Sequence, residues 1–309
     1  MIQQNFKKRI KMYQNKQAII AMLIAALLFT FMGMFVKVLT PNLPAIEVAF
    51  ARNFFGLVWV LIALALKPPK TPQGGRPFIL IFRGFAGGSA MIAYFYNMSV
   101  MPLGIAFAFS YTSPIFLALF SVFFIRQKVS FKVWIAIFLG FSGILLISNP
   151  QNLHLSFWGL SIGIYSGVAA ALAYLSVAEL AKNYDPRIII GSLGFFGSLL
   201  PLLTQLVPYE NYPISLFMPF VMPTFYEWIL VLGLGVVSTY AQIYLTKAYM
   251  LGNPPIIGAI SYVTIFMATL AGIILGDQIP NALVISGMAL IACGGILAAL
   301  SNKRKKSNS

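Results

Sequence analysis

Long apolar runs separated by short polar breaks dominate the chain. Ten of them have the length of a membrane-crossing helix, at residues 18–39, 44–66, 78–98, 103–125, 131–148, 158–178, 187–207, 226–248, 255–275 and 281–300. A bilayer core about 30 Å thick needs about 20 apolar residues per helix. Turn-forming residues mark the breaks, as in Ser148-Asn149-Pro150 and Asn253-Pro254-Pro255. The pattern predicts an all-α integral membrane protein with ten transmembrane helices, and an interfacial loop at 208–224.

Lysine and arginine residues are distributed on one side of this predicted topology. Of the 21 in the chain, 19 lie before the first run, after the last run or beside the even-numbered breaks. The odd-numbered breaks contain none. Cytoplasmic segments of membrane proteins carry such an excess of positive charge. We therefore expect both termini in the cytoplasm, with a basic N-terminal segment at 1–17 and a basic tail at 301–309.

The fourth run has a polar centre. Ser110, Tyr111, Thr112, Ser113 and Pro114 lie together in the middle of an otherwise apolar stretch. A helix in lipid must satisfy its backbone hydrogen bonds internally, and a proline within it removes one of them. Hydroxyl groups and a free carbonyl at this depth are tolerated where they face protein or a watery cavity.

A weaker echo of this pattern occurs about 150 residues further on, where Ser261, Tyr262 and Thr264 interrupt the ninth run. The echo divides the chain into two five-helix repeats, at 18–148 and 158–300, joined by an outer connection at 149–157. Because five is odd, the second repeat must be inverted in the membrane. Inverted repeats with a site at their interface are a recurring transporter plan.

Composition narrows the class further. The chain has 309 residues, of which 60% are hydrophobic and only 9% are charged, which excludes a soluble single-core protein. We attribute the net charge of +15 to membrane topology and expect no nucleic-acid partner. A single cysteine and a single histidine leave no basis for a disulfide framework, a metal site or a cofactor. The first apolar run is longer than that of a secretory signal, so we interpret it as an uncleaved span.

Ionisable residues inside the predicted helices are the first candidates for function. Arg52 lies about 12 Å into the second helix at 1.5 Å per residue, a depth at which a cation needs a partner or a cavity. A direct pair with Glu47 is awkward, because the two lie roughly 140° apart around the helix at 100° per residue. A bound anion or an ion pair with another helix would satisfy Arg52. Lys37, near the outer end of the first helix, is expected to snorkel to the interface.

Other polar and small residues fall on defined helix faces. Tyr94 and Asn97 share one side of the third helix, and Tyr240, Tyr244 and Lys247 form a stripe on the eighth. These positions suit cavity lining, helix packing or interfacial anchoring. Glycine-rich stretches, such as the one around Gly84 and Gly88, predict close helix packing. We expect Glu179, Lys182, Asp185 and Arg187 to lie in a solvated cytoplasmic connection.

These features resemble the EamA-type transporters of the drug/metabolite transporter superfamily over residues 18–300. The resemblance rests on the ten-span layout, the two halves, the run from Glu47 to Arg52, Arg76-Pro77-Phe78, Arg83-Gly84, and the Pro114 helix that leads to Phe123-Phe124. The Glu47–Arg52 run is similar to the subgroup that includes S-adenosylmethionine carriers of intracellular bacteria. One departure is that Gln127 stands where the first half would carry an acidic residue, whereas the second half has Asp277.

The resemblance implies transport of a small metabolite by alternating access, through a central cavity lined by the third, fourth, eighth and ninth helices. Related members carry amino acids, nucleotide-like cofactors and drugs. The expected substrate-binding residues are Arg52, Glu47, Tyr94, Ser110, Tyr111, Ser113, Tyr240, Tyr244, Ser261 and Tyr262.

The sequence therefore predicts a secondary transporter of the inner membrane rather than an enzyme. Arg52 would hold an anionic group and the central hydroxyl groups would orient it. Glu47 is the candidate for proton coupling, because burial favours the neutral form of a carboxyl group; a counter-substrate is the other candidate coupling partner. No phosphate-binding glycine–lysine loop indicates ATP hydrolysis. A channel and a lipid-modifying membrane enzyme are the alternatives.

Overall fold

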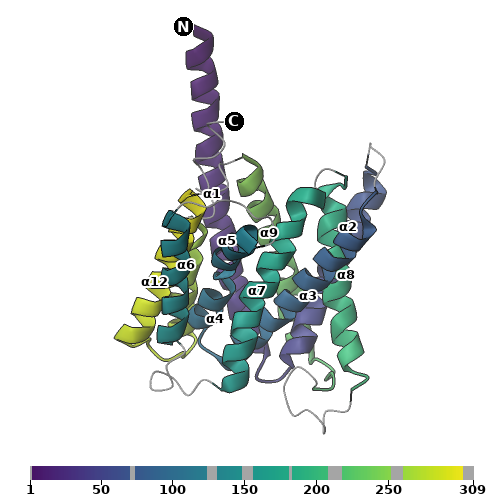
Figure 1. The fold of residues 1–309 in the computed structure, drawn as a ribbon. Helices are drawn as coiled ribbons and strands as arrows, with labels where there is room; N and C mark the ends of the chain where they lie inside the picture. The colour runs from purple at the N-terminus through teal and green to yellow at the C-terminus, as the bar shows by residue number, and fades with distance from the viewer. Residues whose placement is uncertain are drawn as a thin grey trace.

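The computed structural model describes residues 2–69, 74–123, 131–147, 156–180, 183–207, 218–251 and 260–301, and every regular element in these ranges is a helix. The helices are α1 (Ile2–Leu39), α2 (Ala45–Leu66), α3 (Pro77–Val100), α4 (Leu103–Ser110), α5 (Ser113–Phe123), α6 (Phe131–Ile147), α7 (Phe157–Leu180), α8 (Pro186–Thr204), α9 (Phe225–Leu251), α11 (Val263–Ile274) and α12 (Ala282–Ser301). Figure 1 shows them as one bundle, with the start of α1 and the end of α12 at the same end.

The helix boundaries follow the predicted apolar runs. For example, α3 covers Pro77–Val100 against the predicted 78–98, and α6 covers Phe131–Ile147 against 131–148. Six helices of the described part are long and apolar enough to cross a membrane, and the apolar helices α6, α11 and α12 are shorter. The first helix extends beyond its predicted run, because the backbone stays helical from Ile2 through the basic segment. Most of the predicted outer connection 149–157, residues 208–217 of the predicted loop, the break at 253–255 and the tail beyond Ser301 lie outside the described residues.

The predicted polar centre of the fourth run is a break between two helices. α4 ends at Ser110, Tyr111 and Thr112 form a turn, and α5 starts at Ser113. The second half repeats this geometry, because a turn at Tyr262 precedes α11. The fourth and ninth runs are therefore interrupted at matching positions.

Helices from the first half pack mainly against helices from the second half. The closest associations are α1 with α9, α6 with α12, α3 with α7 and α8, α2 with α8, and α4 with α11. Glycines permit the tightest of these contacts: a Cβ atom at Gly88 of α3 would lie 2.7 Å from the backbone nitrogen of Gly197 on α8. The close packing predicted for the glycines of the third helix is confirmed.

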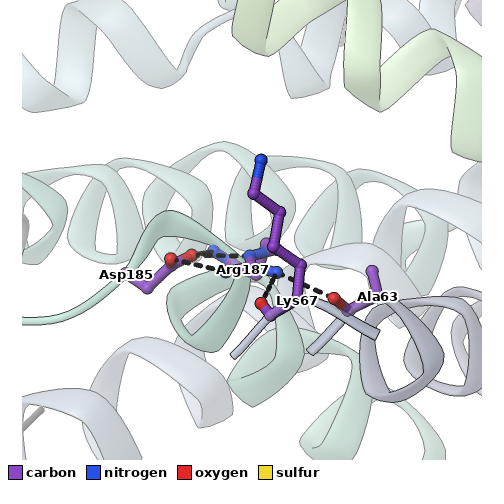
Figure 2. A network of polar contacts seen from close by, with 4 residues as sticks. All are labelled: Ala63, Lys67, Asp185 and Arg187. Atoms are coloured by element: carbon purple, nitrogen blue, oxygen red, sulfur yellow. Dashed lines mark hydrogen bonds and ion pairs between the residues drawn. The ribbon is translucent and has the colours of Figure 1, made fainter. Parts of the chain in front are cut away.

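At one end of the bundle, Arg187 joins the start of α8 to the end of α2 (Figure 2). Its Nη1 atom donates hydrogen bonds to the carbonyl oxygens of Ala63 at 2.8 Å and Lys67 at 2.6 Å, and its Nη2 atom contacts Asp185 Oδ2 at 2.9 Å. The Lys67 carbonyl group follows the last residue of α2, where a helix leaves carbonyl groups without an internal partner, whereas the Ala63 carbonyl group also accepts the Lys67 N–H at 3.2 Å. The Arg187 hydrogen bond holds the pKa of Asp185 below its ordinary value. Asp185 and Arg187 of the predicted solvated connection are partly exposed, and Arg187 in addition binds the end of a neighbouring helix.

A second polar joint connects the C-terminal end of α1 with the segment that follows α11. Lys37 Nζ lies 2.8 Å from Asp277 Oδ1 and donates to the carbonyl oxygen of Met101 at 3.0 Å. The other carboxylate oxygen of Asp277 accepts a hydrogen bond of 2.8 Å from the backbone N–H of Leu103. Instead of snorkelling freely, Lys37 is paired with an acidic residue, because the α11–α12 connection folds back over the end of α1.

Candidate functional site

The two interrupted helices meet at their breaks. The Tyr111 hydroxyl donates to Thr264 Oγ1 at 3.1 Å, and the Tyr262 hydroxyl donates to the carbonyl oxygen of Tyr111 at 3.1 Å. Their rings lie 5.9 Å apart. The Tyr111 carbonyl group at the break thus accepts a hydrogen bond from a side chain of the other half. The polar centres of the two halves are thus brought together.

The neighbouring serines belong to the same region but differ in exposure. Ser113 and Ser261 are buried, whereas Ser110 is half-buried. Gly295 of α12 provides the space for the Tyr262 ring, since a methyl group there would overlap the phenol. The buried ring of Tyr94 extends this cluster: it lies 5.2 Å from Phe107, which stacks on Tyr111 at 6.3 Å. Six of the predicted residues therefore lie in or beside one aromatic cluster: Tyr94, Ser110, Tyr111, Ser113, Ser261 and Tyr262.

Arg52 is buried in α2, with 7% of its surface exposed. Its Nη1 atom donates to Asn53 Oδ1 at 2.9 Å, and the Asn53 amide donates to the carbonyl oxygen of Ala49 at 2.8 Å. The Arg52 Nε atom is buried and has no hydrogen-bond partner. Among the described residues no carboxylate forms an ion pair with Arg52. A neutral amide leaves the charge of the guanidinium group uncompensated.

Glu47 lies at the start of α2 and faces a different space from Arg52. Its Oε2 atom accepts a hydrogen bond of 2.9 Å from the backbone N–H of Val221 in the loop before α9. The carboxylate lines a cavity of about 480 Å³ whose walls are mainly apolar and include Phe54, Phe220 and Trp228. The absence of a Glu47–Arg52 pair among these contacts agrees with their separation around the helix.

The predicted tyrosine stripe on α9 lies apart from these groups. Tyr240 has 52% of its surface exposed, and Tyr244 packs beside a small cluster formed by Ala18, Met22 and Ala248 between α1 and α9. Lys247 is exposed. The structure thus gathers the polar residues of the two broken helices but does not bring Tyr240 and Tyr244 to them.

The sequence of the first half matches the EamA-like transporter family over residues 16–149. An uncharacterized transporter of Helicobacter pylori (strain J99 / ATCC 700824) is 32% identical over 281 residues, which cover 90% of this chain and 93% of that protein. The chain belongs to the EamA-type transporter family. As an EamA-type protein of the drug/metabolite transporter superfamily, it is a multi-pass membrane transporter.

Further relatives of this EamA-type chain have named substrates. The pseudopaline exporter CntI of Pseudomonas aeruginosa (strain UCBPP-PA14) is 28% identical and covers 94% of this chain and 98% of its own length. An S-adenosylmethionine uptake transporter of Rickettsia bellii is 22% identical, covering 88% of this chain and 89% of the relative. A solved crystal structure matches the fold with a TM-score of 0.61 at 19% identity, over 94% of this chain and 99% of its own.

Sequence reasoning did not select two residues of the EamA-type bundle as candidates for the site, Arg83 and Tyr174. Arg83 of α3 is buried, and Tyr174 of α7 is an electrostatic neighbour of both Arg52 and Arg83. Arg83 was counted among the charges that flank a cytoplasmic connection. Its position inside the predicted third helix, well past Pro77, was the signal that could have identified it.

The described part of the bundle holds no group of three or more His, Cys, Asp or Glu side chains that could bind a metal ion. The chemistry available in its interior is that of guanidinium groups, hydroxyl groups and aromatic rings. Such groups bind and orient a polar molecule by charge and hydrogen bonding.

Proposed function

We propose that this EamA-type protein is a secondary active transporter of the inner membrane that moves a small metabolite bearing an anionic group by alternating access. The observation that carries the proposal is the burial of the Arg52 guanidinium without an acidic partner among the described residues. Placing an uncompensated cation in a membrane interior costs several kcal/mol. A substrate carboxylate or phosphate that binds Arg52 would offset that cost during each transport cycle.

The pattern of helix contacts supports two halves related by an inverted repeat, an arrangement on which many alternating-access transporters are built. In the two repeats α1 corresponds to α7, α2 to α8, α3 to α9 and α6 to α12. Exchanging each helix for its counterpart converts the contact of α1 with α9 into the contact of α7 with α3, which is also present. The same exchange converts α3–α8 into α2–α9, while α2–α8 and α6–α12 convert into themselves. When corresponding helices of two halves make corresponding contacts, the halves can move as rigid bodies between two equivalent arrangements around a site between them.

The groups around the two helix breaks would orient the substrate. The hydroxyls of Tyr111, Tyr262 and the neighbouring serines lie at the interface of the halves. The named relatives support a polar metabolite of amino-acid or nucleoside character, since one exports pseudopaline and another takes up S-adenosylmethionine. Glu47, beside its own cavity, is the proposed site of proton coupling.

Two other functions were considered. A channel would need a continuous pore lined by a ring of charges or carbonyl groups, whereas Tyr111 and Tyr262 close on each other between the halves. A lipid-modifying membrane enzyme would need clustered acid–base residues, which the interior of the described bundle does not bring together. A transport rate that saturates with substrate concentration and shows counterflow would distinguish a carrier from a channel and from a lipid-modifying enzyme.

The test is substitution of Arg52 by Gln in the purified full chain, reconstituted into vesicles. We expect counterflow of a metabolite with a carboxylate group, such as an amino acid or S-adenosylmethionine, by the parent protein, and loss of at least about 90% of that rate in Arg52→Gln. Binding energy from one charged hydrogen bond, about 1.5–3 kcal/mol, corresponds to a loss of this size. Membrane insertion should be unchanged.

The matched control is Arg76→Gln, because Arg76 is exposed and pairs with Glu179 at 3.1 Å. This variant should transport at nearly the parent rate. A normal rate in Arg52→Gln would show that Arg52 does not bind the substrate.

A further inference from the structure

Arg83 is a second buried cation in the interior of the bundle. It lies in α3, about 9 Å from the helix start at Pro77 by the helical rise, and only 7% of its surface is exposed. A long basic side chain this close to a helix end ordinarily extends to the membrane surface. Arg83 does not, and both its Nε and Nη1 atoms are buried without a hydrogen-bond partner.

The packing around Arg83 leaves room for the buried position. Gly87 lies one helical turn further along α3, and a methyl group there would overlap the Arg83 Nη1 atom. The same hypothetical methyl group would lie 3.1 Å from Leu193 of α8. The guanidinium group therefore lies across a glycine, alongside α8, in a position that any larger residue at 87 would obstruct.

Arg52 and Arg83 lie on helices that pack against the same stretch of α8. A methyl group at Gly197 of α8 would lie 2.5 Å from the Asn53 side chain, next to Arg52, and Leu193 one turn earlier lies beside Gly87 of α3. The Tyr174 side chain of α7 is the electrostatic neighbour of both guanidinium groups. Tyr174 keeps 52% of its surface exposed. Arg52 lies about 10 Å from the outer start of α2 and Arg83 about 9 Å from the opposite side of the membrane. The two guanidinium groups thus belong to residues at different depths in the bundle.

The chain has no described acidic residue left to neutralise them. It contains six acidic residues, and Glu210 lies outside the described part. Each of the other five has a partner elsewhere: Glu47 with Val221, Glu179 with Arg76, Asp185 with Arg187, Glu227 with Thr224, and Asp277 with Lys37. Among the described residues no carboxylate therefore forms an ion pair with either guanidinium group, and a bound molecule could supply the negative charge.

We propose that Arg83 and Arg52 bind the same transported molecule, which carries two carboxylate groups, one for each guanidinium group. This inference rests on the proposed function, because it assumes that Arg52 binds the substrate. A guanidinium group matches a carboxylate by paired hydrogen bonds, which makes arginine well suited to such recognition. Tyr174 is the electrostatic neighbour of both groups and can donate a hydrogen bond to the bound molecule.

The first test uses thermal shift of the full chain in detergent with three matched probe pairs: succinate and succinamate, glutarate and glutaramate, adipate and adipamate. A ligand that binds the folded state raises its thermal stability. We expect at least one dicarboxylate to bind ten or more times more tightly than its monoamide. Arg83→Gln should remove this preference and leave the weaker binding of the monoamide. Arg76→Gln should keep it.

A second test needs no ligand and separates substrate binding from a structural role. A buried charge without a partner destabilises the fold, so Arg83→Met should leave the thermal midpoint unchanged or raise it while abolishing transport. A drop in the midpoint, compared with Arg76→Met, would make Arg83 a structural residue and overturn the proposal.

The possible failures of the two proposals are distinguishable. Equal binding of dicarboxylates and monoamides, lost only in Arg52→Gln, would overturn the two-carboxylate inference and leave the single-anion transporter intact. Loss of neither binding nor transport in Arg52→Gln would overturn both. Stronger binding of glycerol 3-phosphate than of every dicarboxylate would replace two carboxylates by one doubly charged phosphate and also overturn the inference.

Discussion

At the scale of single residues, Glu47 joins a titratable group to the loop before α9. Its carboxylate accepts the Val221 N–H and borders a cavity of about 480 Å³. Glu47→Gln keeps an oxygen that can accept this hydrogen bond but removes the proton exchange. We expect the variant to retain substrate counterflow and to lose acceleration by a pH gradient. Vesicles with an imposed gradient would measure this, and an unchanged gradient response would exclude Glu47 from coupling.

Single residues also show how far the sequence determined the site. The depth of Arg52 and its separation from Glu47 around the helix followed from spacing alone. Arg83 was missed because a basic residue near a helix end usually reaches the membrane surface, and only the packing of α3 against α8 shows that this one cannot. The pairing of Lys37 with Asp277 could not be predicted either, because the two residues lie 240 positions apart and no local pattern indicates which helix ends will meet.

At the scale of helices, α3 and α8 depend on contacts between glycines. A Cβ atom at Gly88 would lie 2.7 Å from the backbone nitrogen of Gly197, so neither backbone can yield without separating the helices. We expect Gly88→Ala to lower stability by about 1–3 kcal/mol, the usual cost of overpacking. Thermal unfolding in detergent would measure the shift.

The control for this substitution is Gly56→Ala on α2, where an added Cβ would meet nothing within 4 Å. Alanine favours a helix over glycine by roughly 1 kcal/mol, so this variant should be as stable as the parent or more so. Equal stability of Gly88→Ala and Gly56→Ala would show that the α3–α8 contact can relax.

Helix boundaries were the most predictable part of the fold, because apolar runs bounded by turn residues leave few alternatives. The polar centre of the fourth helix was predicted from Pro114 and its neighbours, but as part of one span, and the structure divides that span into α4 and α5. The ninth helix contains no proline at the matching place, yet it turns at Tyr262. Only the similarity between Ser110-Tyr111 and Ser261-Tyr262 indicated a polar interruption at this place. The hydrogen bond from the Tyr262 hydroxyl to the Tyr111 carbonyl group stabilises the turn.

At the scale of the whole molecule, the Lys37–Asp277 joint connects the ends of α1, α4 and α11. Both side chains are mostly buried, at 22% and 8% exposed. Removing one partner of a buried pair costs about 3 kcal/mol. We expect Lys37→Met and Asp277→Asn each to lower the thermal midpoint, and the exchanged pair Lys37→Asp with Asp277→Lys to recover part of the loss. Additive losses in the exchanged pair would show that the two charges do not act together.

The contact between the two helix breaks has a mechanical consequence. The Tyr262 hydroxyl donates to the Tyr111 carbonyl group, so a hydrogen bond joins the two breaks directly. In the proposed transport cycle, α5 in one half and α11 in the other would move as linked segments. We expect a movement that begins on one side of the membrane to reach the opposite side in step, rather than as two independent motions.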